Sequence, residues 1–272
     1  MKDSKLREAF TSEALFTKEL LGYGATQIRR ANYATQGLYF QSFNNLSIGL
    51  ERIGKICLIL DFFVRTKGTF PTDEYLRKTI GHDLIKIYEK SQEIIKERTF
   101  ELKSGSTFSN PIHYNIMKVL SDFANGQRYS NINLLLGNKQ QSGPIATWYK
   151  KVDVPIFKNE VSQRKKSQIR LDAKEMEREL GSFSAVHYIS EDGSIINTLE
   201  DASYRTGAFE AVAPKRQLYV LQIIRYWVEL LLSLELLSME IDQRLTPDFD
   251  EIFGGLRNDD AYMKTRKTWD KD

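Results

Sequence analysis

The chain has 272 residues, of which 41% are hydrophobic and 28% are charged, and its formal net charge is only +3. This composition is ordinary for a folded globular protein, and so small a charge does not indicate a nucleic-acid-binding protein unless basic residues cluster on one surface. The single cysteine, Cys57, excludes an intrachain disulfide framework or a cysteine-rich zinc site, and the first residues lack the apolar segment of a signal peptide. We therefore expect a cytoplasmic protein.

Residues 36–67 carry the clearest helical pattern in the chain. Apolar side chains recur there at steps of three and four along one face, and further apolar residues widen that face. Because such a helix is buried on most sides, we expect it at the centre of a helical bundle. Gly68 and Pro71 end it, and a looser apolar pattern predicts an earlier helix over residues 4–33.

Three later segments also have helical patterns. Apolar residues predict a helix over residues 82–100, and Asn110 followed by Pro111 is a typical start for the next helix. Residues 215–245 are apolar on nearly every side, so we expect the longest helix there and expect it to be buried. Three acidic residues in this segment argue against a membrane span, because carboxylates are costly in lipid. They are Glu229, Glu235 and Glu240.

The stretch before this last helix has a weaker pattern. Residues 159–180 are charged and have helical propensity, and alternating residues around Asp192 and Gly193 predict a β-hairpin. The last residues, 255–272, are polar, and we expect them to be frayed. The sequence therefore predicts an all-α antiparallel helical bundle with an irregular insertion that contains a small hairpin. Its expected parts are residues 1–137 of the bundle, the charged insertion 138–213, the last bundle helix 214–246 and a polar tail 247–272.

The order of three short motifs carries a resemblance. The first long helix contains GLERIGKICLIL (49–60), the next begins with GHDLIKIY (81–88), and RYSNIN (128–133) follows. In this order the motifs resemble those of the HEPN superfamily of helical-bundle proteins. The resemblance covers residues 30–136 and 214–242, and it implies a HEPN-like bundle.

Many HEPN proteins are metal-independent RNases, several of them toxins or antiphage effectors, and their signature is an arginine followed four to six residues later by a histidine. Arg77 and His82 match this spacing, so the resemblance implies that they are catalytic. It also implies a homodimer in which two such pairs line one cleft. Lys78 departs from the signature, because active members carry Asn, Asp or His directly after the arginine. Other HEPN proteins perform no chemistry and bind a nucleotide, an RNA or a partner protein, such as an antitoxin, a nucleotidyltransferase or a defence-complex subunit.

The residue types suit RNA cleavage without a metal. Histidine can take a proton from the 2′-hydroxyl or give one to the leaving oxygen near neutral pH. An arginine fork can stabilise the charge that builds on the phosphate oxygens, and a nearby helix N-terminus adds backbone donors. The alternative is that His82 has a structural or partner-binding role, because an arginine and a histidine at this spacing occur often by chance.

Three further residues are candidates for binding substrate or partner. Asp83 could orient the His82 imidazole, or it could simply occupy the first helical turn, where a negative charge is favourable. Arg128 and Tyr129 follow a predicted break in a helix, where they could face a functional groove. The alternative is a surface arginine beside a core tyrosine.

The densest basic run is SQRKKSQIR (162–170), whose residues Arg164, Lys165 and Lys166 could contact phosphates together with Lys78. Acidic residues flank this run, so it could equally form a solvated helix face. Elsewhere, Glu51 and Lys55 are spaced as an ion pair one helical turn apart. No residue cluster has the spacing of a metal site or of a phosphate-binding glycine loop, so we expect no metal and no cofactor.

Overall fold

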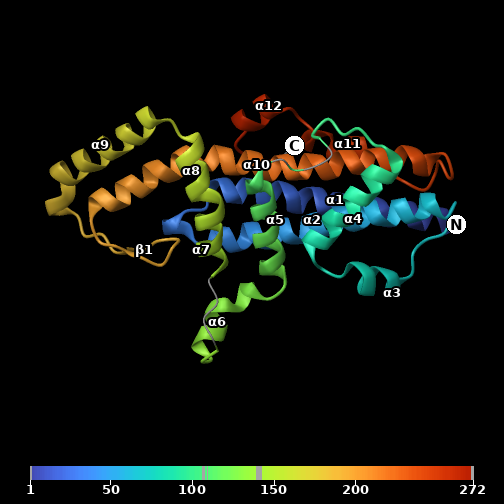
Figure 1. The fold of residues 1–272 in the computed structure, drawn as a ribbon, viewed down its shortest axis with the longest axis horizontal. Coiled ribbons are helices and arrows are strands. Elements are labelled where there is room, and N and C mark those ends of the chain that lie inside the picture. The colour runs from blue at the N-terminus through green and yellow to red at the C-terminus, as the bar shows by residue number, and fades with distance from the viewer. Residues whose placement is uncertain (1, 106–107, 109, 139–142, 271–272) are drawn as a thin grey trace.

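The computed structural model describes residues 2–105, 108, 110–138 and 143–270, and it is almost entirely helical (Figure 1). Three long helices run side by side along its longest axis: α1 (Lys2–Arg30), α2 (Gly37–Arg65) and α10 (Leu199–Met239). The only sheet in the described ranges is a two-stranded hairpin. The predicted all-α bundle with a small hairpin is confirmed.

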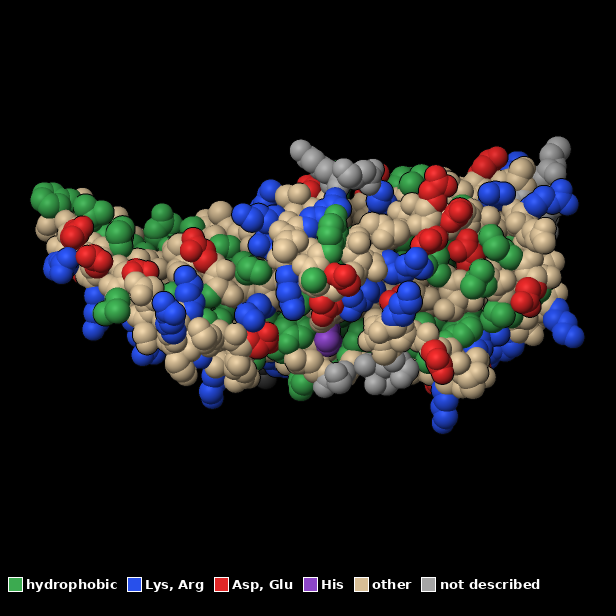
Figure 2. Space-filling view, turned by 90° about the horizontal axis from the view of Figure 1, so that it is seen from above, with side chains coloured by type: hydrophobic (Ala, Val, Ile, Leu, Met, Phe, Trp, Pro, Cys, Tyr) green, Lys and Arg blue, Asp and Glu red, His purple; other side chains and the backbone are tan. Residues whose placement is uncertain are grey.

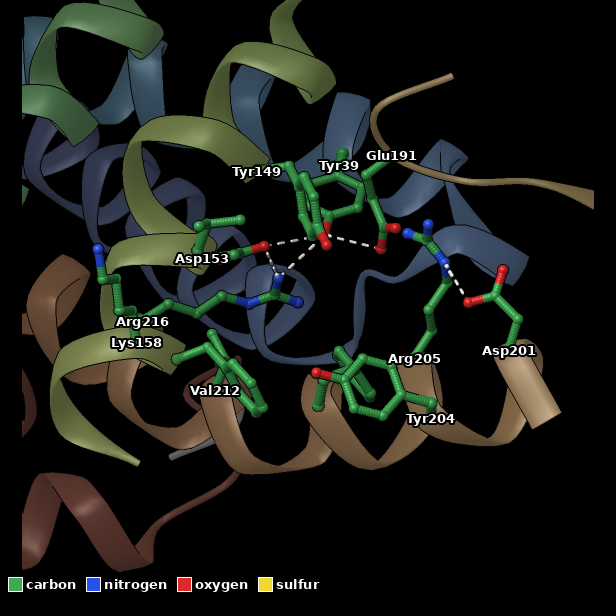
Figure 3. A pocket seen from close by; sticks show the side chains of 14 residues that line it. Tyr39, Tyr149, Asp153, Lys158, Glu191, Asp201, Tyr204, Arg205, Val212 and Arg216 are labelled. Carbon is green, nitrogen blue, oxygen red and sulfur yellow. Dashed lines mark hydrogen bonds and ion pairs between the residues drawn. The ribbon is translucent and has the colours of Figure 1, made fainter. Parts of the chain in front are cut away.

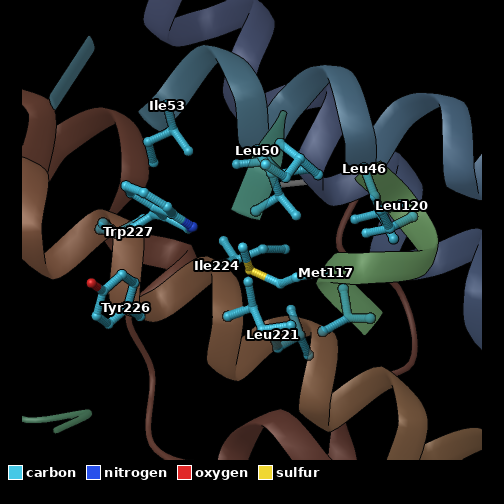
Figure 4. Packing of buried hydrophobic residues seen from close by; sticks show 14 of the residues in the cluster. Leu46, Leu50, Ile53, Met117, Leu120, Leu221, Ile224, Tyr226 and Trp227 are labelled. Atoms are coloured by element: carbon cyan, nitrogen blue, oxygen red, sulfur yellow. The ribbon is translucent and has the colours of Figure 1, made fainter. Parts of the chain in front are cut away.

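Helix α2 lies at the centre of the bundle, as its apolar pattern predicts. Its buried side chains include Leu46, Leu50 and Ile53, which pack against residues of α10 such as Trp227 (Figure 4). Helix α1 packs tightly along α2, because a Cβ on Gly24 would come within 2.5 Å of the Leu46 side chain. Burying this much apolar surface is the main driving force for the arrangement of the three helices.

Two shorter helices cover α2 and α10 from the side. They are α4 (Leu84–Arg98) and α5 (Pro111–Ala124). The Asn110 side chain caps α5 by accepting a hydrogen bond from the backbone of Ile112, and Pro111 occupies the first turn, as predicted. The remaining helices are short except for α9: α3 (Asp73–Tyr75), α6 (Ser130–Leu135), α7 (Pro144–Trp148), α8 (Val154–Glu160), α9 (Gln163–Leu180), α11 (Phe249–Phe253) and α12 (Asp260–Thr265).

The longest helix begins earlier than predicted. We expected it to start near residue 215, but α10 begins at Leu199, where the Thr198 hydroxyl caps it by accepting from the backbone of Asp201. Pro214 lies inside the helix. A proline normally ends a helix because it removes one backbone hydrogen bond, but here α9 and α2 pack along α10 and keep it continuous. The expected boundary between insertion and last helix therefore falls within one helix.

The C-terminal residues are also more ordered than predicted. We expected residues 255–272 to be frayed, but Leu256, Met263 and Trp269 are buried. The backbone of Trp269 donates a 2.7 Å hydrogen bond to Thr26 of α1, which fixes the chain end against the bundle. The apolar residues here are too widely and unevenly spaced to give a helical period, so the sequence pattern did not reveal their burial.

The predicted hairpin is confirmed. Strands β1 (Tyr188–Ile189) and β2 (Ile195–Ile196) pair in antiparallel register around the turn that contains Asp192 and Gly193. The Ser190 hydroxyl contacts side chains across this turn. In the part of the chain that the structure describes, no helix is long and apolar enough to cross a membrane.

Candidate functional site

His82 stands on the surface where α2 and the start of α4 meet. Its Nδ1 lies 2.8 Å from Oε1 of Glu51, which is on α2, and the same carboxylate oxygen accepts a 2.7 Å bond from Lys55. The predicted pair of Glu51 and Lys55 is therefore present, and His82 joins it. The imidazole is 73% exposed while the carboxylate is only 18% exposed, so a largely shielded acid holds a ring that faces solvent.

The backbone before His82 makes a sharp turn. Gly81 has φ of +62°, in a region that favours glycine because it has no Cβ. The turn separates a short π-helical segment (Leu76–Ile80) from α4. It directs His82 toward Glu51 rather than continuing the preceding helix.

Arg77 and Lys78 lie on the π-helical segment before this turn. Arg77 is 77% exposed and forms an ion pair with Asp73, while Lys78 is 76% exposed and pairs with Glu74 at 2.5 Å. The structure thus places both cations on the surface near His82 in the chain, but each is held by an acid one turn earlier. Arg77 and His82 share no bonding partner among the described residues.

Asp83 serves as the N-cap of α4. Its Oδ1 accepts hydrogen bonds from the backbone of Ile85 at 2.9 Å and from the Ser121 hydroxyl at 3.0 Å. The Ser121 hydroxyl in turn accepts from the backbone of Leu84. These contacts fix α4 against α5, and the Asp83 carboxylate accepts from backbone amides and from the Ser121 hydroxyl rather than from His82.

Arg128 and Tyr129 follow the predicted break after α5, in a 3-10 turn (Gln127–Tyr129) that leads into α6. Both side chains are exposed, and the Arg128 guanidinium lies over the Tyr129 ring at 5.3 Å. Tyr129 is therefore not a core residue. Figure 1 shows α6 projecting away from the long helices, so the arginine stands at the base of a protrusion.

The basic run lies in the first turns of α9, at the opposite end of the long axis from α3 (Figure 1). Arg164 and Lys165 are exposed, and Lys166 donates to the backbone carbonyl of Lys158 at 2.7 Å. The run is thus well separated from the surface around His82. On the face drawn in Figure 2, lysine and arginine side chains are interspersed with acidic ones and form no single basic patch.

A second cluster of charged residues was not predicted from the sequence. Tyr39 of α2, Asp153, Glu191 of the hairpin and Arg216 of α10 meet at a cavity of about 290 Å³ (Figure 3). Arg216 donates to Asp153 at 2.8 Å and to the Tyr39 hydroxyl at 3.0 Å, and both members of the ion pair are buried. The other Asp153 oxygen accepts from the Trp148 indole at 3.0 Å.

Burial dominates the electrostatics of this cluster. Desolvation raises the pKa of both Asp153 and Glu191, and the nearby Arg216 partly offsets the effect. A buried charge is costly unless it is paired and hydrogen-bonded. The pair of Arg216 and Asp153 meets this condition, whereas Glu191 faces no cation at ion-pair distance among the described residues.

The local sequence does not indicate this cluster. Arg216 directly follows Lys215, and Asp153 comes soon after Lys151, so neither residue stands out as an isolated charge in an apolar segment. The sequence also does not indicate that the two residues pair, because they are 63 positions apart.

No protein family, curated protein or solved structure was found to match the chain. Within the described ranges, no group of three or more His, Cys, Asp or Glu side chains could hold a metal ion. The functional argument therefore depends on the geometry of the chain itself.

Proposed function

We propose that this chain is a HEPN-like, metal-independent endoribonuclease that acts as a toxin or an antiphage effector. The observation that carries the proposal is the 2.8 Å contact between Nδ1 of the exposed His82 and the carboxylate of Glu51. A carboxylate on one ring nitrogen fixes the tautomer and orientation of the imidazole. The other nitrogen, Nε2, then remains to exchange a proton with a substrate.

In the proposed reaction the Nε2 atom of His82 removes the proton from a 2′-hydroxyl, and the resulting oxyanion attacks the adjacent phosphorus while the 5′ oxygen leaves. Arg77 stabilises the charge on the phosphate oxygens. To do so it must leave Asp73 and pair with the phosphate instead. The free-energy cost of leaving Asp73 is small, because exposed ion pairs contribute only about 0–1 kcal/mol. Lys78, which is exposed, adds a second cationic contact in the same way.

A single His82 supplies one acid–base group, while the cleavage needs both a base and an acid. We therefore propose a homodimer in which the two copies of this surface form one cleft. The exposed position of His82 and Arg77 is compatible with such a cleft, because neither side chain is covered by its own chain.

The test combines growth and RNA analysis. Expression of the wild-type chain should halt growth and cleave cellular RNA, and the purified chain should cleave RNA in the presence of EDTA. His82→Ala should abolish both effects, while His187→Ala, which alters an exposed histidine of the hairpin segment, should leave them unchanged. Cleavage that requires a metal ion, or that survives His82→Ala, would refute the proposal.

A second candidate is a HEPN-like binding module without catalysis. The pairing of Arg77 with Asp73 and of Lys78 with Glu74 favours it, because both cations are already neutralised within one turn. Such a module would bind an RNA, a nucleotide or a partner protein on the same surface. Growth arrest with intact RNA, together with binding that survives His82→Ala, would support this candidate over the nuclease.

A further inference from the structure

The cavity beside Arg216 has the shape and lining of a small-molecule site. Its volume of about 290 Å³ is close to the lower end of the range for ligand pockets, roughly 300–1,000 Å³. Five aromatic side chains from four segments of the chain line it: Tyr39, Tyr149, Phe157, Tyr204 and Phe209. Figure 3 shows the three tyrosines around the cavity. Walls of this kind suit a flat or apolar ligand body.

The acids and the cations that line the cavity are equal in number, but one acid, Glu191, forms no ion pair among the described residues. Arg216 pairs with Asp153 at 2.8 Å and Arg205 pairs with Asp201 at 3.2 Å, so these four charges balance. Glu191 is only 8% exposed, and its carboxylate forms no ion pair among the described residues: it contacts its own backbone N–H and, at a long 3.5 Å, the Tyr39 hydroxyl.

The Tyr39 hydroxyl cannot satisfy Glu191 alone. It carries one proton, and it also lies 3.3 Å from Asp153, so the two carboxylates compete for the same donor. Burial raises the pKa of Glu191, because desolvation outweighs the opposing effect of Arg216 and Arg205, neither of which forms an ion pair with it. A cationic group of a ligand would give Glu191 the direct ion-pair partner that it lacks.

The cavity also offers unused donors. Nη1 of Arg205 and Nε of Arg216 are buried and have no hydrogen-bond partner in the described structure. A buried N–H group without an acceptor costs about 1–3 kcal/mol. An oxygen of a ligand would remove that cost, and Lys158 at the exposed rim adds a further positive charge.

We propose that this cavity binds a small zwitterion with an aromatic body, such as a free aromatic amino acid. Its ammonium group pairs with Glu191, its carboxylate accepts from Arg205, and its ring packs between the aromatic walls. The proposal stands apart from the endoribonuclease activity, because the cavity and His82 use different residues.

Three small molecules test the contact with Glu191 and the contact with Arg205 independently. Each is titrated into the purified full-length chain, and its binding is measured by calorimetry. L-phenylalanine carries both charges, phenethylamine only the amine and 3-phenylpropionate only the carboxylate. We expect L-phenylalanine to bind most tightly, phenethylamine less tightly and 3-phenylpropionate least tightly. The amine ranks above the carboxylate because Glu191 lacks a cation, whereas both arginines already have acidic partners.

Glu191→Gln should weaken binding of the two amines by about tenfold or more, since a hydrogen bond to a charged group contributes about 1.5–3 kcal/mol. It should leave 3-phenylpropionate unaffected. Glu89→Gln, at an exposed position of α4, is the matched control and should change nothing. Ala208→Trp, which places a bulky side chain in the cavity, should reduce binding of all three probes.

Melting temperatures establish that each variant is folded, and the cavity-filling variant preserves every charge in case Glu191→Gln fails to fold. The proposal is overturned if none of the probes binds at millimolar concentrations. It is also overturned if phenethylamine binds Glu191→Gln as tightly as it binds the wild type, or if 3-phenylpropionate is the tightest of the three.

Discussion

The ion pair of Arg216 with Asp153 and that of Arg77 with Asp73 use the same residue types in opposite surroundings. The first pair is 1% and 7% exposed and joins two helical segments distant in sequence. The second is 77% and 72% exposed and lies within a single turn. A buried pair must stay closed, because opening it leaves a desolvated charge, whereas an exposed pair can exchange partners freely. The buried pair therefore fixes the architecture, and the exposed pair is available for a ligand.

The largest expected effect comes from breaking the buried pair. Arg216→Met should lower the free energy of unfolding by about 3–5 kcal/mol, because it leaves Asp153 buried without its cation. Urea denaturation followed by circular dichroism measures this change. The matched control, Arg77→Met, should cost less than about 1 kcal/mol. Equal losses in the two variants would contradict the comparison.

A buried and an exposed acid can also be compared near the end of α10. Burial raises the pKa of Glu235 to about 7, while its side chain accepts a hydrogen bond from the backbone of Phe249. As pH rises from about 4.5 to 7 the unfolded chain loses this proton before the folded chain does, so stability falls with pH. After allowance for partial solvation, the loss is on the order of 1–2 kcal/mol.

Glu235→Gln replaces the ionisable carboxyl group with an amide that does not titrate. The free energy of unfolding should then depend less on pH over that window. Glu240→Gln, at an exposed position one turn later, should leave the dependence unchanged. Urea titrations at a series of pH values measure both variants. If the free energy of unfolding falls more steeply with pH in Glu235→Gln than in the wild type, the buried carboxyl group is not the cause of the pH dependence.

The elements predicted correctly are those specified by neighbouring residues. The apolar face of α2, the cap formed by Asn110 with Pro111, and the hairpin turn at Asp192 each depend on a few adjacent positions. The start of α10 was predicted too late because packing against α9 overrides the local effect of Pro214. Tertiary contacts of this kind leave no periodic signal in the sequence.

The candidate sites show the same division. The spacing of Glu51 and Lys55 predicted their pair, but the addition of His82 to it depends on a contact between residues 31 positions apart. The cavity is further removed from any local pattern, since Arg216 reaches a tyrosine 177 positions earlier in the chain. Short sequence motifs could thus identify the surface site. The residues of the cavity are far apart in the sequence and meet only in the folded chain.

A smaller effect on stability is expected at the surface site. Glu51→Gln weakens the hold on the His82 ring, so RNA cleavage should fall by about tenfold to a hundredfold, less than the loss from removing the base itself. The free energy of unfolding should change by less than about 1 kcal/mol.

The control for this variant is Glu13→Gln, which breaks an exposed pair between α1 and α2, the 2.6 Å contact of Glu13 with Arg52. It should have the same small effect on stability and none on cleavage. Unchanged cleavage in Glu51→Gln would show that the carboxylate does not position His82 for the reaction.

The smallest expected effect is the coupling between Arg77 and Asp73 in the free chain. A double-mutant cycle with Arg77→Ala, Asp73→Ala and the combined variant should give a coupling energy of about 0.2–1 kcal/mol, and added salt should reduce it. RNA affinity should nevertheless change in opposite directions, because Asp73→Ala frees the guanidinium for phosphate and Arg77→Ala removes it. A coupling energy as large as that of the buried pair would mean that Arg77 is committed to Asp73, and the surface would then lose the cation that the cleavage mechanism requires.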